Sequence, residues 1–186
     1  AIRARGGRGL IMGGFVRDMA LGAESKDLDV EVYGLSPERL EEILSSFGEV
    51  LVVGRSFGVF KIKRLDVEID FSMPRRDSKV GPGHKGFVVE VDPGLPLHEA
   101  VRRRDFTMNS MAFDPLTGEW FDPFGGREDL VKGLLRVTDP ATFAEDPLRA
   151  LRAAQFISRF ELTPDELGNM RRECVAGECL GVPHHI

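Results

Sequence analysis

Apolar and acidic residues alternate along two stretches of the chain, DLDVEVY at residues 27–33 and VEIDF at residues 67–71. Successive side chains of a strand point to opposite faces, so a period of two predicts a half-buried strand with one acidic face. Shorter apolar runs predict further strands, which we place near Leu10–Met12, Val50–Val53, Val59–Lys63, Phe87–Val91 and Trp120.

Helix signals lie between these strands. Phe15–Leu21 follows the glycine pair Gly13-Gly14 and ends at Gly22, a residue type that suits a helix C-cap. A second helix opens at Ser36-Pro37-Glu38, where the serine can cap the helix and proline fits its first turn. We expect Gly48 to end this helix and its buried stripe to contain Leu40, Ile43, Leu44 and Phe47.

The pattern becomes irregular between Pro74 and Pro96, where Gly, Pro, Lys and Arg are frequent. We expect a loop there, interrupted only by the short strand at Phe87–Val91. Leu97–Phe113 begins with a helical pattern, and the sequence DPLTG at residues 114–118 predicts a hairpin-like turn.

The character of the chain changes after Val137. Phe143–Phe160 predicts one amphipathic helix, and the capping box Thr163–Glu166 predicts the start of another. We therefore expect a mixed head domain over residues 1–137 and the incomplete start of a helical neck over residues 138–186.

Composition is that of a folded protein, with 42% hydrophobic and 30% charged residues. No apolar run approaches the roughly 20 residues that span a bilayer, and no signal-peptide pattern is present, so we expect a cytoplasmic protein without a membrane partner. The chain opens at Ala1 without an initiator Met and stops early in the helical part, so we expect the native protein to extend further at both ends.

The net charge and the cysteines do not decide between classes of function. The net charge of −5 counts mildly against a nucleic-acid partner, although Arg102–Arg104 forms a local basic cluster that by itself suggests a solvated face. Cys174 and Cys179, followed by His184 and His185, lack the second ligand pair of a typical zinc site. We expect two reduced thiols there.

The acidic strand face carries the first candidate chemistry. Asp27 and Asp29 are two residues apart, so on a strand both carboxylates point the same way. Hard cations such as Mg²⁺ prefer oxygen ligands and keep water and phosphate oxygens in their shell. Asp70 on another strand is the candidate for a third ligand, with Glu68 on the same face as the fallback. An Asp-x-Asp pair alone more often marks a solvated face.

The glycine pair before the first helix is the second feature that suggests a functional site. Backbone N–H groups at a helix N-terminus bind anions, and Gly13 and Gly14 would let a phosphate approach closely. Arg17, one turn into the helix, can add a charge-assisted hydrogen bond. A glycine turn alone is weak, but followed by a paired-carboxylate strand it is typical of nucleotidyl transfer, with phosphates held at one end and metals at the other.

These segments resemble a known family. GGFVRDMALGAESKDLDVEVYG closely resembles the signature of the class II tRNA nucleotidyltransferases, which are the bacterial CCA-adding enzymes and their poly(A) polymerase relatives. VEIDFSMPRRD, RRRDFTMNSMAFD, DPFGGREDL and EDPLRALRAAQF are similar to later segments of that family and stand in the same order. The resemblance covers roughly residues 10–160.

The resemblance implies an α+β fold: a polymerase-beta-like nucleotidyltransferase head with a mixed β-sheet flanked by helices, followed by the start of an all-helical neck. It implies that an RNA 3′-hydroxyl attacks the α-phosphorus of CTP or ATP and releases pyrophosphate. The implied cofactors are two Mg²⁺ ions, and the implied partner is the 3′ end of tRNA. Poly(A) polymerase and CC-adding or A-adding specialists share these motifs and stay open as alternatives.

The resemblance also implies roles for single residues. Asp27 and Asp29 would hold the metals together with Asp70. Gly14, Arg17 and Arg104 would contact the incoming nucleotide, next to Gly13. Asp146 and Arg149 would read the base, Glu145 would orient Arg149, and Arg152 would lie at the same site. Gln155 departs from family members that carry arginine there, which leaves that contact in doubt.

Two further residues of these motifs are expected to brace the site. Asp105 could tie the head to the arginine-bearing helix through a salt bridge, and Asn109 would support it. An inactive RNA-binding module is the alternative from another class of protein. It would be favoured if Asp27 or Asp29 were absent, and both are present.

Overall fold

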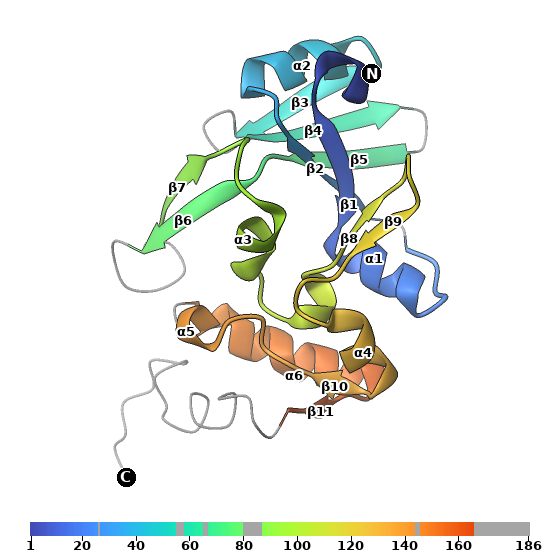
Figure 1. Ribbon diagram of the computed structural model, residues 1–186, viewed down its shortest axis with the longest axis vertical. Coiled ribbons are helices and arrows are strands. Elements are labelled where there is room, and N and C mark those ends of the chain that lie inside the picture. Colours follow the sequence, from blue (N-terminus) through green and yellow to red (C-terminus); the bar gives the residue numbers. More distant parts are fainter. Residues whose placement is uncertain (26, 55–57, 65–66, 80–86, 144–145, 166–186) are drawn as a thin grey trace.

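The computed structural model describes residues 1–25, 27–54, 58–64, 67–79, 87–143 and 146–165. Within these ranges the chain forms a seven-stranded sheet in the order β3-β4-β5-β2-β1-β8-β9 (Figure 1). Only the β2–β5 pair is parallel in this sheet, so the sheet is mixed. The strands are β1 (Arg8–Met12), β2 (Leu28–Tyr33), β3 (Glu49–Gly54), β4 (Val59–Arg64), β5 (Val67–Ser72), β8 (Ala112–Asp114) and β9 (Glu119–Phe121).

Helices lie at both ends of this sheet. Figure 1 shows α2 at one end of the molecule and α4, α5 and α6 at the other, with the strands of the seven-stranded sheet between them. The expected α+β head with a mixed sheet and flanking helices is therefore confirmed. The helices are α1 (Gly13–Ala20), α2 (Pro37–Ser45), α3 (Leu97–Arg102), α4 (Gly126–Val131), α5 (Pro140–Phe143) and α6 (Leu148–Phe160), with 3₁₀ turns η1 (Arg3–Arg5) and η3 (Thr107–Asn109).

The two alternating stretches form the parallel pair at the centre of the sheet. Val32 and Phe71 are buried on one face, against α2, whereas Asp29 and Asp70 stand half-exposed on the other. The strand register pairs Asp29 with Asp70 directly. The period of two therefore predicted both strands and the face on which each carboxylate lies.

Local signals explain the first two helices. The side-chain oxygen of Ser36 accepts a hydrogen bond from the backbone N–H of Arg39, so the predicted N-cap of α2 is confirmed. The helix α1 ends at Ala20 with Leu21 as its C-cap, and Gly22 follows with a positive φ of 69°, one residue beyond the predicted cap position. The expectation for Phe47 was wrong: α2 ends at Ser45, and Phe47 lies beyond it with 46% of its surface exposed.

The segment after β5 contains a strand that the sequence pattern did not indicate. Arg75–Lys79 forms β6, which pairs antiparallel with β7 (Phe87–Val91). The expected loop was therefore wrong for this part, because a strongly polar strand shows no apolar alternation. Residues 80–86, with His84, lie outside the described residues.

The predicted long helix is interrupted. Phe143 ends α5, and α6 begins only at Leu148, after Pro147. A proline lacks the N–H that an interior helix position needs, so Pro147 prevents one helix from running through Phe143–Phe160. Thr163–Pro164 forms β11, paired with β10 (Leu134–Leu135), and not a helix start. The remainder of the predicted second helix, from residue 166 onward, lies outside the described residues, as do both cysteines and the C-terminal histidines.

One hydrophobic core spans the expected domain boundary. Phe106 makes edge-on ring contacts with Phe143 and Phe156 at centroid distances of 5.8 and 5.6 Å. Leu135 and Leu162 belong to the same cluster, so residues on both sides of Val137 are packed together. The boundary near residue 137 stays a prediction. None of the described helices is both long and apolar enough to cross a membrane.

Candidate functional site

Two carboxylates meet where β2 and β5 run side by side. Asp29 and Asp70 are register partners, and neighbouring strands lie about 4.8 Å apart. Burial raises the pKa of Asp29; the cation of Arg104 opposes this, while the carboxylates of Asp70 and Asp27 raise the pKa further. A raised pKa in a group with two acidic neighbours indicates a place where a cation would be stabilising.

Asp27 is less closely joined to this pair. It precedes β2 and is exposed, although its charge is felt by Asp29. In the described parts of the chain, no three Asp, Glu, His or Cys side chains lie close enough together to hold a metal ion. The structure therefore brings together two of the three predicted metal ligands, with the third nearby.

A lysine that the sequence reasoning missed lies against the predicted third ligand. Lys61 is the register partner of Asp70 on β4, and its Nζ lies 2.8 Å from Asp70 Oδ1 and 3.0 Å from Glu68 Oε1. The hydrogen bonds with Asp70 and Glu68 raise the pKa of Lys61. Lysines alternate along VFKIKR at residues 59–64, opposite the acidic face of β5, and this pattern could have indicated the pairing.

The glycine pair forms the first turn of α1 and does not precede it, a small correction to the predicted start. Gly13 has a positive φ of 64°, and a Cβ on it would lie 2.9 Å from Arg104 Nη1 and 3.9 Å from Asp29 Oδ2. The Arg104 guanidinium therefore lies over the helix start, within reach of the carboxylates. A Cβ on Gly14 would make ordinary contact with Arg17, at 3.5 Å.

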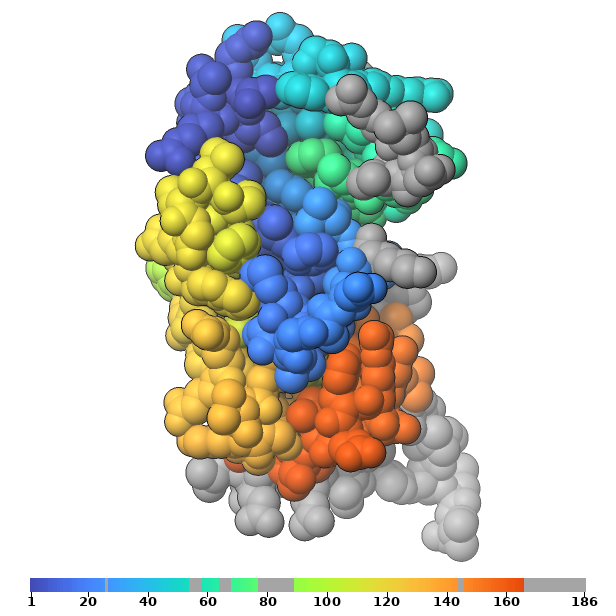
Figure 2. Space-filling model, turned by 90° about the vertical axis from the view of Figure 1, so that its right-hand side faces the viewer, coloured from blue at the N-terminus to red at the C-terminus, as the bar shows by residue number. Residues whose placement is uncertain are grey.

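Arg17 is buried against α6. Its guanidinium donates to Asp18 Oδ1 at 2.8 Å and to Asn109 Oδ1 at 2.9 Å, and it lies 4.7 Å from the centre of the Phe160 ring. Figure 2 shows the blue surface of α1 directly against the orange-red surface of α6. The Arg17 side chain is only 6% exposed, so in this structure it packs between α1 and α6.

The two bracing residues do link the arginines. Arg152 Nε donates to Asp105 Oδ2 at 2.6 Å, and Asn109 Nδ2 donates to Asp105 Oδ1 at 3.1 Å. Because Asn109 also accepts from Arg17, one chain of hydrogen bonds joins α6 to α1. The predicted salt bridge from Asp105 to the arginine-bearing helix is confirmed.

Arg149 is held by backbone carbonyls near the start of α6. Its Nη1 donates to the carbonyl of Thr142 at 2.9 Å, and its Nη2 donates to that of Arg103 at 2.7 Å. Asp146 Oδ1 accepts from the backbone N–H of Leu148, the first residue of α6, at 3.0 Å. Glu145 lies outside the described residues, and Gln155 is exposed on α6.

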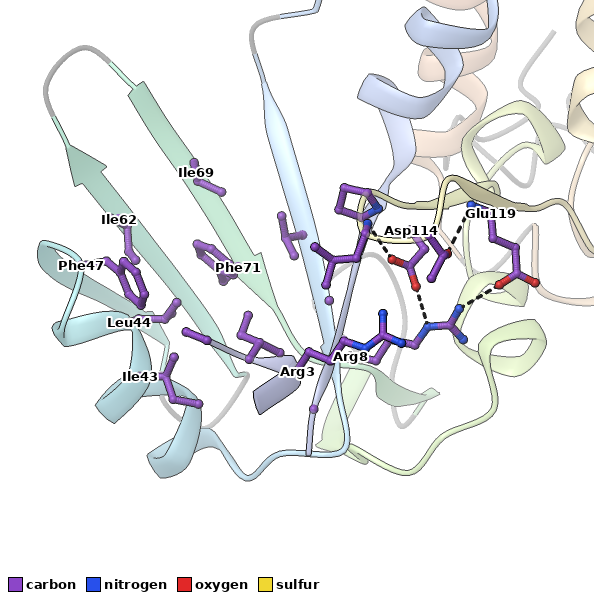
Figure 3. Close-up of a pocket in the computed structure, with 18 residues that line it drawn as sticks. Arg3, Arg8, Ile43, Leu44, Phe47, Ile62, Ile69, Phe71, Asp114 and Glu119 are labelled. Atoms are coloured by element: carbon purple, nitrogen blue, oxygen red, sulfur yellow. Dashed lines mark hydrogen bonds and ion pairs between the residues drawn. The ribbon is translucent and has the colours of Figure 1, made fainter. Parts of the chain in front are cut away.

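A cavity of about 890 Å³ lies on the opposite face of the sheet. Figure 3 shows its apolar lining from α2 and the strands, including Leu44, Ile69 and Phe71, beside the ion pairs from Arg8 to Asp114 and Glu119. Ile69 and Phe71 alternate with Asp70 along β5. The cavity is therefore separated from the carboxylates by the sheet, and none of the predicted site residues lines it.

Comparison with known proteins decides the family. Residues 10–136 match the model of the poly A polymerase head domain. The chain belongs to this family. The matched range contains the glycine turn, the carboxylate pair and Arg104, so these features are parts of a poly A polymerase head domain.

Three similar proteins illustrate the membership. The Multifunctional CCA protein of Xylella fastidiosa (strain 9a5c) is 40% identical over 173 residues, which cover 90% of this chain and 40% of that protein. A tRNA-processing enzyme with CTP has a TM-score of 0.77 at 31% identity, over 94% of this chain and 45% of that one. A tRNA nucleotidyltransferase complexed with a primer tRNA and an incoming ATP analogue has the same TM-score and identity, over 94% of this chain and 49% of that one.

This chain spans less than half of the length of these relatives. More than half of the length of each relative therefore has no counterpart in this chain.

Proposed function

We propose that this chain is the catalytic head of an enzyme that adds CMP and AMP from CTP and ATP to the 3′ end of tRNA, the reaction called CCA addition. The observation that carries the proposal is the register pair Asp29 and Asp70, with Arg104 lying over the Gly13 turn beside it. Membership of the poly A polymerase head-domain family, and the tRNA and nucleotides named for its solved relatives, support the same reading.

Two Mg²⁺ ions would complete this site, held by Asp27, Asp29 and Asp70. The carboxylates fit such ions in chemistry, because Mg²⁺ prefers oxygen ligands. Burial raises the pKa of Asp29 most, and the carboxylates of Asp70 and Asp27 add to the rise, so a bound cation would stabilise the ionised form. When bound, the ions would lower the pKa of the attacking 3′-hydroxyl and stabilise the leaving pyrophosphate. Lys61 would have to yield part of its contact with Asp70, and Glu68 would then keep it nearby.

The nucleotide's phosphates would lie at the start of α1. Gly13 and Gly14 leave room there, and backbone N–H groups at a helix start attract anions. Arg104 is the cation we favour for the triphosphate, because its side chain is 21% exposed and close to the carboxylates. The contact of Arg17 with the nucleotide stays a prediction, since its guanidinium is taken up by Asp18 and Asn109 in this structure.

The base would be read at the start of α6. Asp146 offers acceptors and Arg149 offers donors, which suits the amino group and ring nitrogen that cytosine and adenine share. Arg152, tied to Asp105, would border the same site, and Glu145 would orient Arg149. The cytoplasm is the compartment we propose, because tRNA, CTP and ATP occur there together.

Poly(A) addition is the second candidate, favoured by the description of the matching family. The deciding experiment offers CTP, ATP or both to the intact protein, with a tRNA that lacks its terminal CCA and with an unrelated single-stranded RNA. We expect C, C and A on the tRNA and then arrest. Long A tracts on either RNA with ATP alone would identify a poly(A) polymerase, and addition of C only or of A only would identify a specialist.

Two substitutions control this experiment. Asp29→Asn should lower nucleotide addition by more than about a hundredfold, because it removes a ligand charge from the metal site. Glu128→Gln makes the same chemical change at an exposed position of α4, away from the site, and should leave the rate unaltered. If the wild-type protein bound tRNA but added neither nucleotide, an RNA-binding module would replace the proposal.

A further inference from the structure

A third acidic residue of β2 is buried beside the site. Glu31 continues the acidic face after Asp27 and Asp29, yet its side chain is 0% exposed. A buried carboxylate is costly unless its oxygens are paired. The sequence reasoning left Glu31 without a role, although its place in the alternation was the signal for it.

Both oxygens of this carboxylate are occupied, and by different kinds of group. Tyr33 O–H donates to Glu31 Oε1 at 2.5 Å. The second oxygen, Oε2, lies 3.5 Å from Arg103 Nη2 and 3.7 Å from Arg104 Nη2. Burial and the Glu31 carboxylate raise the pKa of Tyr33, so its hydroxyl stays a donor across the physiological range.

The arginines held by Glu31 lie beside the proposed nucleotide site. Arg104 Nη1 lies over Gly13, and its charge counters the rise in the pKa of Asp29. The same nitrogen lies 3.5 Å from the backbone carbonyl of Asn109, and Arg104 also forms the ion pair with Glu31. Arg104 Nε is buried there without a hydrogen-bond partner.

We propose that Glu31 is a positioning residue that holds the guanidinium of Arg104 in place for the incoming nucleotide. This inference rests on the proposed function, because it takes Arg104 as a nucleotide contact. An arginine side chain has about 2 kcal/mol of rotamer entropy to lose on binding, and a partner that orients it beforehand reduces that cost. Glu31 itself touches neither nucleotide nor metal.

The pairing also reaches the base-reading helix. Arg149 donates to the carbonyl of Arg103, the neighbour that shares Oε2 with Arg104. Glu31 therefore joins the carboxylate strand to α6 through the segment Arg103–Arg104. Loss of Glu31 should affect KM for both CTP and ATP, because the two nucleotides share the triphosphate.

The test is steady-state kinetics on the intact protein carrying Glu31→Gln, which keeps the shape and removes the charge. We expect KM for CTP and for ATP to rise about tenfold, the worth of one charge-assisted contact, with kcat changed by less than about threefold. Tyr33→Phe leaves the arginine pairing intact and should change KM by less than about threefold.

A double substitution separates positioning from mere support of the fold. Arg104→Ala alone should raise KM, and adding Glu31→Gln to it should have no further effect, because Glu31 acts through Arg104. Additive losses in the double variant, or a wild-type KM in Glu31→Gln, would overturn the proposal. If the wild-type protein added no nucleotide at all, the proposed function would fail, and equilibrium binding of CTP and ATP to the same variants would still test Glu31.

Discussion

At the scale of single residues, two arginines predicted for one task lie in different surroundings. Arg17 is 6% exposed, with its charge matched by Asp18 and its face on the aromatic rings of α6. Arg104 is 21% exposed and lies beside Asp29. A sequence motif presents them as equals, but burial separates an arginine that holds elements together from one that can meet a ligand.

The ionised carboxylate of Asp29 should lower the free energy of unfolding. Burial raises its pKa above the ordinary value of 3.8, so the folded state binds this proton more tightly than the unfolded chain does. The ionised carboxylate is therefore destabilising above the folded-state pKa, and the cost disappears as the pH falls below the ordinary value. Asp29→Asn should raise the thermal midpoint at neutral pH without metal, and this gain should vanish in acid.

Calorimetry of both proteins over a series of pH values checks this expectation. At neutral pH, Mg²⁺ should reduce the difference in thermal midpoint between Asp29→Asn and the wild type. The reason is that a ligand that binds only the folded wild type stabilises that protein. A variant that is less stable than the wild type at neutral pH would show that the Asp29 charge is compensated in the fold.

At the scale of elements, aromatic residues of α6 pack this helix against the rest of the protein. Phe156 packs edge-on against Phe106, and the guanidinium of Arg152 lies 5.2 Å from the centre of its ring. Phe156→Ala should lower the free energy of unfolding by about 3–5 kcal/mol, the usual cost of removing a buried phenyl ring. Leu151→Ala on the exposed face of α6 should change it by less than about 0.5 kcal/mol. Urea unfolding measures both, and equal losses would contradict this packing.

The proposed base selection also belongs to the scale of elements, because it concerns the start of α6. Two backbone carbonyls fix the orientation of Arg149, so its remaining donor capacity has a set direction. Arg149→Ala in the intact protein should raise incorporation of UMP and GMP relative to CMP and AMP by about tenfold, because hydrogen-bonded sites reject analogues strongly. Single-nucleotide extension measures this ratio, with Arg159→Ala at the far end of the helix as the matched control. Uniform loss of activity with unchanged selection would make Arg149 a brace.

The elements could be predicted where their pattern is local. Alternation in VEIDF predicted β5 and its acidic face, and the Ser36-Pro37 signal predicted α2. The strand β6 is Arg-Arg-Asp-Ser-Lys and forms only because β7 pairs with it, so no apolar period could indicate it. Pro147 was a visible stop signal, but the strong amphipathic pattern around it favoured one continuous helix.

The whole molecule has a core that crosses the expected domain boundary. Phe106, Leu135 and Phe156 belong to one cluster, so ending the chain after Val137 would expose its buried apolar surface. A chain of residues 1–137 should therefore unfold at a clearly lower temperature than residues 1–165, which should unfold in a single transition. Circular dichroism on both chains checks this. Equal midpoints would support a head that folds independently at the predicted boundary.

The candidate site could be predicted in its residue types more fully than in its contacts. Two strand patterns predicted the acidic faces that carry Asp29 and Asp70, whereas the register that pairs these residues came only from the fold. Lys61 against Asp70, Phe160 against Arg17 and Glu31 beneath Arg104 arise from segments distant in sequence. Motifs identify chemistry, whereas burial and partners depend on packing that a local pattern does not contain.

The parallel pairing of β2 with β5 has a consequence for the order of folding. Parallel neighbours cannot be joined by a tight turn, and the connection between β2 and β5 contains α2, β3 and β4. Closing a long connection is slow, and antiparallel hairpins such as β4–β5 form sooner. The carboxylate pair should thus be absent from the folding transition state. Mg²⁺ would then slow unfolding and leave the refolding rate unchanged. Stopped-flow measurements of the folding and unfolding rates with and without Mg²⁺ test this. Faster refolding in the presence of Mg²⁺ would show that the pair assembles early.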